Sequence, residues 1–158
     1  MLIGRYGGTS AGPHLEGLLS LPGLGLKDVL VSFLVDTGAG RCIIGPLDVE
    51  RLGIDRSRLR GDEGVFGVGG SETYYQEEGY LGFTAEDEGV IHYYAVNMLI
   101  SKKMPERRAE PLMPREVPSL IGMELIEQWR VYLCPSEGVA EYEVLDSTVS
   151  VPIPNNDG

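Results

Sequence analysis

The strongest constraint on this chain is an almost unbroken apolar and β-branched run, Val29 to Val35, that ends abruptly at Asp36. Such a run predicts a strand that is buried on both faces. The aspartate is followed directly by Thr37, Gly38, Ala39 and Gly40. A charged residue behind a core strand, with glycines after it, indicates a carboxylate that a tight loop holds at the strand's end. The sequence therefore predicts a fold built around one positioned carboxylate.

The rest of the chain favours an all-β domain. Its 158 residues fit one domain that can bury its own core. The 22 glycines and 10 prolines indicate frequent turns and short extended segments more than a helical bundle. Patterning predicts further strands over residues 14–21, 73–75, 80–83, 90–96, 119–122, 131–133 and 140–145. Acidic turns separate 73–75, 80–83 and 90–96, which predicts a β-meander there.

Two short helices are expected beside these strands, over residues 46–52 and 123–129. Three prolines and mixed charges make residues 101–116 an exposed connection. We therefore expect one folded domain over residues 13–145. A flexible N-terminal arm is expected at residues 1–12 and a C-terminal tail at residues 146–158.

Charge and composition argue against several classes of function. The formal net charge of -11 repels phosphate backbones and anionic lipids, so neither nucleic acid nor a membrane is an expected partner. No apolar run approaches the roughly eighteen residues of a spanning helix and no leader is visible, so we expect a cytoplasmic protein. Cys42 and Cys134 are expected to be reduced. These cysteines, His14 and His92 lack metal-ligand spacing, so no metal site is expected.

A glycine cluster, Gly64 to Ser71, has more than one interpretation. It is not typical of a phosphate-binding loop, because no lysine follows it and no helical pattern begins there. An ordinary hairpin turn fits its composition. A lid that opens for a substrate and closes to exclude water fits it as well.

Four features occur in one order along the chain: Phe33 to Ala39, the glycine cluster, the strands that follow, and Leu120-Ile121-Gly122 before a short helix. In this order they resemble the retropepsin family, the single-domain aspartic proteases of retroviruses and their cellular and bacterial relatives. The resemblance covers residues 14–144. It implies an acid protease fold, an all-β closed barrel with one short C-terminal helix, that works as a dimer.

The resemblance also implies roles for the residues of the carboxylate loop. Asp36, Thr37 and Gly38 would be catalytic, with the Thr37 hydroxyl reaching the partner's loop and Gly38 letting the two backbones approach. Ala39 would pack beneath them and line the substrate cleft. Gly40 departs from the family pattern, because many relatives have Ser or Asp there.

Two further elements receive roles from the same resemblance. The glycine cluster would be the flap, a hairpin that holds bound peptide through Phe66, Gly67, Val68, Gly69 and Gly70. An apolar-apolar-Gly element would support the catalytic loop from behind, through Leu120, Ile121 and Gly122.

Peptide hydrolysis by this route needs one carboxylate as base and one carboxylic acid. Two aspartates about 3 Å apart meet this need because the pair holds one shared proton. The chain contains a single Asp-Thr-Gly, so the second Asp36 must come from a second copy in a symmetric homodimer. We therefore predict an aspartic endopeptidase that acts on protein or peptide substrates without a cofactor. The alternative is a non-catalytic peptide-binding or dimerisation module with the same fold, which the intact Asp36-Thr37-Gly38 disfavours.

Overall fold

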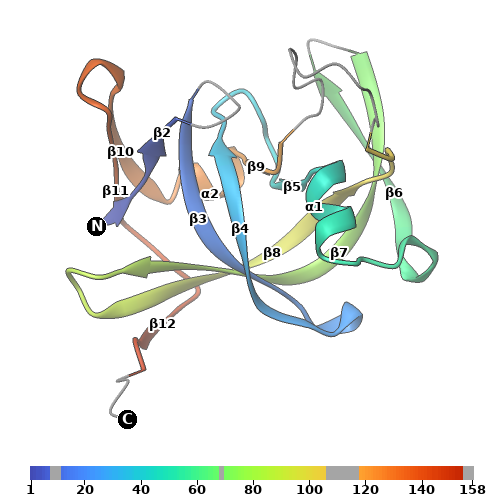
Figure 1. The fold of residues 1–158 in the computed structure, drawn as a ribbon, viewed down its shortest axis with the longest axis horizontal. Helices are drawn as coiled ribbons and strands as arrows, with labels where there is room; N and C mark the ends of the chain where they lie inside the picture. Colours follow the sequence, from blue (N-terminus) through green and yellow to red (C-terminus); the bar gives the residue numbers. More distant parts are fainter. Residues whose placement is uncertain (8–11, 68–69, 106–117, 155–158) are drawn as a thin grey trace.

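The computed structural model describes residues 1–7, 12–67, 70–105 and 118–154, and these form a mostly β structure with a few short helices (Figure 1). The strands are β1 (Leu2–Ile3), β2 (Arg5–Tyr6), β3 (Pro13–Leu21), β4 (Leu26–Val35), β5 (Ile43–Ile44), β6 (Arg60–Gly67), β7 (Gly70–Ala85), β8 (Val90–Ser101), β9 (Leu120–Ile121), β10 (Trp129–Cys134), β11 (Val139–Val144) and β12 (Val149–Pro152). The helices are α1 (Pro46–Arg51) and α2 (Met123–Ile126), with 3-10 turns η1 (Pro22–Leu24), η2 (Arg56–Arg58) and η3 (Pro135–Glu137). None of the helices in the described ranges is long and apolar enough to cross a membrane.

Two sheets make up the fold. The smaller sheet has the order β1-β11-β10, and its strands are antiparallel. The larger sheet has the order β12-β8-β5-β9-β4-β3-β7-β6, with β2 added to β3 and a further pairing of β7 with β8. Within it, β4 runs parallel to β9, and β9 pairs antiparallel with β5. The end of β4 therefore lies beside segments that are distant in the sequence.

Strand β7 differs from the expected meander. The segments 73–75 and 80–83 belong to one strand of 16 residues, drawn as a long curved arrow in Figure 1. Its pairing with β8 runs without a break from Tyr74 opposite Ser101 to Ala85 opposite Val90. The prediction of an acidic turn near Glu77 and Glu78 was wrong, because pairing with β8 satisfies the backbone there and the carboxylates lie at the surface.

One face of β4 is buried, and the other face is largely exposed. Val31, Phe33 and Val35 point into the main core. On the other face Ser32 is exposed, and the Leu30 side chain keeps an exposed fraction of 55%. The prediction of a strand buried on both faces was therefore wrong for the first half of β4, because nothing in the described residues covers that face there. An unbroken apolar run does not by itself distinguish these two cases.

The ends of the chain take part in the sheets. Residues 2–6, expected in the arm, form β1 and β2, and residues 149–152, expected in the tail, form β12 on β8. Residues 8–11 and 155–158, and most of the connection expected over residues 101–116, lie outside the described residues. Helix α2 is shorter than predicted, since it ends at Ile126 and Trp129 already begins β10.

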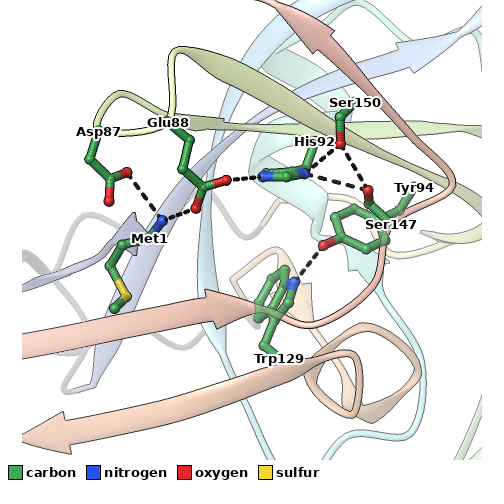
Figure 2. A network of polar contacts seen from close by, with 8 residues as sticks. All are labelled: Met1, Asp87, Glu88, His92, Tyr94, Trp129, Ser147 and Ser150. Carbon is green, nitrogen blue, oxygen red and sulfur yellow. Dashed lines mark hydrogen bonds and ion pairs between the residues drawn. The ribbon is translucent and has the colours of Figure 1, made fainter.

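An aromatic cluster joins the two sheets. The ring of Trp129 packs edge-on at 5.3 Å from Phe83 and at 5.4 Å from Tyr142, measured between centroids. Its indole Nε1 donates a hydrogen bond of 2.8 Å to the Tyr94 hydroxyl (Figure 2). Because the pair is buried, this bond satisfies a donor that would otherwise lose its solvation. The start of β10 is thereby fixed on β8.

A polar network holds both chain ends on the turn between β7 and β8 (Figure 2). Glu88 in this turn accepts from the Met1 amine, and its other oxygen lies 3.0 Å from Nε2 of His92. Nδ1 of His92 lies 2.8 Å from the Ser150 hydroxyl of β12. His92 is buried, and its ring connects the turn to β12.

Replacing Tyr94 with Phe should lower the free energy of unfolding by about 1–3 kcal/mol, because the buried indole N–H of Trp129 loses its acceptor. Urea denaturation followed by tryptophan fluorescence measures this change. Tyr80→Phe is the matched control, since that side chain is exposed. Equal midpoints for Tyr94→Phe and wild type would show that the bond contributes nothing.

Replacing Glu88 with Gln should destabilise the protein in a pH-dependent way. Hydrogen bonds from the Met1 amine, and then from His92, lower the pKa of Glu88. A lowered pKa in the folded state means that the carboxylate stabilises the fold above its unfolded pKa of about 4.3, and that this contribution is lost as pH falls through the folded pKa. The stability gap between wild type and Glu88→Gln should therefore be constant between about pH 6 and pH 8, where the Met1 amine is still charged, and close towards about pH 3.

Thermal unfolding across this range measures the gap. Glu86→Gln, in the same turn, is the control and should keep the wild-type profile. A gap that persists unchanged at the acidic end would contradict the assigned ion pairs.

Candidate active site

The carboxylate of Asp36 lies one residue beyond the end of β4. Leu34 and Val35 pair in parallel with Leu120 and Ile121 of β9. The Asp36 N–H then donates to the Ile121 carbonyl at 3.0 Å. This bond extends the parallel ladder by one step, so the strand pairing itself positions the aspartate.

A tight turn follows the aspartate. The Gly38 N–H donates to Oδ1 of Asp36 at 2.8 Å, and the Ala39 N–H donates to the Asp36 carbonyl at 3.2 Å. A Cβ atom on Gly38 would lie 3.1 Å from the same Oδ1, tighter than ordinary contact. Asp36 and Ala39 are half-buried, whereas Thr37 and Gly38 are exposed. The structure thus holds the carboxylate by backbone groups while the tip of its loop faces outward.

The predicted supporting element lies directly against this loop. Leu120 and Ile121 pair with the end of β4, and both side chains are buried. A Cβ on Gly122 would come within 2.5 Å of the Arg41 carbonyl oxygen, so only glycine fits between the two backbones. Beyond it, the Met123 N–H donates to the Ala39 carbonyl at 2.7 Å. Residues 120–122 and the start of α2 thus pack against the turn that follows Asp36.

The glycine cluster forms the end of the β6–β7 hairpin. Phe66 pairs with Ser71 and Gly67 pairs with Gly70. No helix follows it, which agrees with the rejection of a phosphate-binding loop. Val68, Gly69 and the side chain of Phe66 lie outside the described residues. In Figure 1 this end of the hairpin and the loop after β4 lie along the same upper side of the molecule.

Sequence reasoning missed an ionic link between the carboxylate loop and α2. Oε2 of Glu124 lies 3.2 Å from Nε of Arg41, and Oε1 accepts from the Cys42 N–H at 2.7 Å. Arg41 also donates to the Asn97 carbonyl of β8 at 2.8 Å. The available signal was an arginine directly after the loop and an acidic residue in the first turn of a helix, but more than eighty residues separate them.

Cys42 follows the loop but is not a candidate nucleophile. The side chain is buried, and both cysteines are free. Burial raises the pKa of the Cys42 thiol, so it stays protonated and unreactive. Asp36 therefore remains the candidate for chemistry at this end of β4.

Comparisons with known proteins agree with this geometry. The model of a protein family described as aspartyl protease matches residues 24–125, more than half of the 158-residue chain. Among solved structures, the chain is similar to a retropepsin-like aspartic protease from Rickettsia conorii. The TM-score is 0.50 at 15% sequence identity, over 90% of this chain and 88% of that chain. No curated protein matches the chain significantly.

The matched residues contain β4, Asp36 and its turn, the β6–β7 hairpin, and Leu120-Ile121-Gly122. At 15% identity the solved structure bears on the fold alone, and the family match supplies the relationship. The chain therefore belongs to the aspartyl protease family and has a retropepsin-like fold.

Proposed function

We propose that this protein is an aspartic endopeptidase whose active site forms when two copies bring their Asp36 side chains together. The observation that carries the proposal is a held carboxylate on an outward-facing loop: Asp36 is fixed by the backbone, while Thr37 and Gly38 beside it are exposed. The chain has a single Asp-Thr-Gly, so one copy supplies half of a two-carboxylate site.

Two such carboxylates in contact perform complementary roles. Like charges about 3 Å apart do not both ionise, so the pair holds one proton and its pKa values belong to the pair. The ionised Asp36 takes a proton from water as the water oxygen bonds to the peptide carbonyl carbon. The protonated Asp36 of the second copy gives its proton to the carbonyl oxygen. The first Asp36 then passes the proton it gained to the peptide nitrogen, and the second Asp36 takes a proton back from a hydroxyl of the intermediate. The C–N bond breaks in this step and releases an acid and an amine.

The surrounding elements have matching roles in this proposal. Thr37 of each copy reaches across the two-fold axis and braces the pair, and Gly38 lets the two loops approach. The β6–β7 hairpin acts as the flap, whose backbone groups hold an extended peptide in the manner of an added strand. The order of strand pairings, in which β7 returns to β8, supports a closed, barrel-like body beneath the cleft.

Glu124 has a positioning role in the same scheme. Its two oxygens bind the segment after the turn, through the Cys42 N–H and Arg41, and its own N–H donates to the Gly40 carbonyl at 3.1 Å. Gly40 adds backbone freedom to the loop, since glycine accepts more conformations than any other residue. The link to α2 limits that freedom, so the two carboxylates meet in one geometry.

The Asp36→Asn substitution tests the proposal. Without a carboxylate the pair has no base, so cleavage of an unfolded protein substrate should fall by at least about 100-fold across pH 3 to 8. Asp146→Asn, an exposed aspartate far along the chain, should keep wild-type activity. If the wild type is a folded dimer that cleaves nothing, the chain is the alternative, a non-catalytic binding module.

Replacing Glu124 with Gln tests the positioning role. Glutamine retains an acceptor for the Cys42 N–H but loses the ion pair with Arg41, which is worth up to about 1 kcal/mol. Turnover should fall by up to about fivefold with little change in KM, because substrate is not touched. Arg41→Gln should have a similar effect, and the double variant should be no worse than the poorer single variant.

Glu127→Gln is the control on the same segment, since that side chain is exposed. Steady-state kinetics of wild type and these four variants decide the matter. Strictly additive losses in the double variant would show that Arg41 and Glu124 act separately.

A further inference from the structure

We propose that a groove on the outer face of the large sheet binds an extended, basic segment of another protein. Strands β3 and β4 form its floor, and its sides are β1, β2 and the turn between β7 and β8. The volume of this β3–β7 groove is about 1040 Å³, at the upper end of the roughly 300–1,000 Å³ typical of ligand sites. Asp36 and its loop do not line the groove, so it is separate from the proposed active site.

The groove follows an opening in the strand pairing. On its edge away from β4, strand β3 pairs with β2 over residues 13–14 and with β7 over residues 18–20. In the described part of the chain, no strand pairs with that edge over residues 15–17. Strand β7 pairs only with β8 over residues 83–84, so its facing edge is free as well. Figure 1 shows the β7–β8 hairpin turning away from β3 toward its tip.

These two free edges favour an extended segment over a helix. Backbone N–H and C=O groups at a strand edge need hydrogen-bond partners, and an extended peptide supplies them by adding a strand. A helix uses its own backbone groups internally, so it would leave the strand edges without partners. The backbone of the bound segment therefore provides part of the affinity.

The opening is closed on the side of the core. Leu15 and Phe83 lie at its base and have exposed fractions of 5% and 1%. The Phe83 ring packs against the backbone of β3, since a Cβ on Gly17 would come within 2.8 Å of it. A segment in the groove therefore lies on the outer surface and displaces no core side chain.

Apolar side chains line the groove above this base. Leu18 of β3 is half-buried, and Leu30 lies opposite it on β4 with an exposed fraction of 55%. Ile3 of β1, with an exposed fraction of 63%, lines the groove from the side of the small sheet. Exposed apolar side chains in a concave surface mark an interaction site, so the bound segment contributes apolar side chains of its own.

The charges of the groove favour Lys and Arg in the rest of the segment. Glu16 and Glu86 line it, both are exposed, and neither forms an ion pair with another described residue. Asp87 already pairs with the Met1 amine. Arg5 is the one Lys or Arg among the described lining residues, so two unpaired carboxylates face one guanidinium. The net charge of -11 on the whole chain adds to the attraction of a basic segment.

Binding of a fluorescein-labelled peptide, Lys-Val-Lys-Val-Lys-Val, to the Asp36→Asn protein tests the proposal, since cleavage then does not consume the probe. The Glu16→Lys/Glu86→Lys double variant should raise Kd at least about tenfold, because repulsion replaces two attractions. The control with the same change of charge is Glu127→Lys/Glu137→Lys, at exposed positions outside the groove, and its Kd should stay within about twofold. Fluorescence anisotropy measures Kd, and circular dichroism checks that each variant is folded.

Backbone pairing has its own measurement. With saturating peptide, hydrogen exchange should slow at the amides of residues 15–17 and 83–84. A peptide with N-methyl groups on alternate amides keeps the charge but loses donors, so its Kd should rise at least about tenfold. The peptide in which Glu replaces Lys should not bind, because it adds like charge to the groove.

Three results would overturn the proposal. An equal loss of affinity in the control double variant would mean general attraction to an acidic chain. Slowed exchange in the β6–β7 hairpin, without change at residues 15–17, would place the peptide in the proposed substrate cleft. No binding by the folded Asp36→Asn protein is the third. Because these assays involve no catalysis, a wild type that cleaves nothing overturns the proposed function while the groove stands on its own result.

Discussion

The parallel pairing of β4 with β9 is the contact on which the candidate site depends. Through it the Asp36 N–H reaches the Ile121 carbonyl at 3.0 Å, one step past the last paired residues. A parallel pair joins distant segments by necessity, so this bond closes a loop of more than eighty residues. Gly122 then lets the backbone of Arg41 pass at a distance that no Cβ would permit. Both sides of the carboxylate turn are thereby fixed by backbone groups, which hold position more rigidly than side chains do.

The half-buried Asp36 carboxylate and the exposed tip of its loop are compatible with the proposed site, of which one copy supplies half. Fixing a single Asp36 carboxylate requires little free energy, because the Gly38 N–H donates a hydrogen bond to it and the tip of its loop is exposed to water. In the proposed dimer, two like charges meet only on association, when one of them takes up a proton.

Sequence patterns predicted a strand or helix well where one local pattern was strong. They failed where contacts between distant segments determine the structure. The run before Asp36 predicted a strand and its abrupt end, and Pro46 predicted the start of α1. The acidic pair Glu77 and Glu78 predicted a turn that the structure lacks, because β8 supplies hydrogen bonds through that stretch. The link between Arg41 and Glu124 was not predicted, because neither residue has a local pattern that identifies its partner.

By itself the sequence determined the mostly β character, the position of a carboxylate at the end of a core strand, and the order of motifs that relates the chain to the aspartyl protease family. These depend on neighbours along the chain, where steric preference and periodicity act directly. Only the tertiary structure decided which face of β4 is covered, that Leu120-Ile121-Gly122 lies against the turn, and that β10 keeps an open edge. Burial and edge exposure are properties of how strands meet in space, and no segment of the sequence carries them alone.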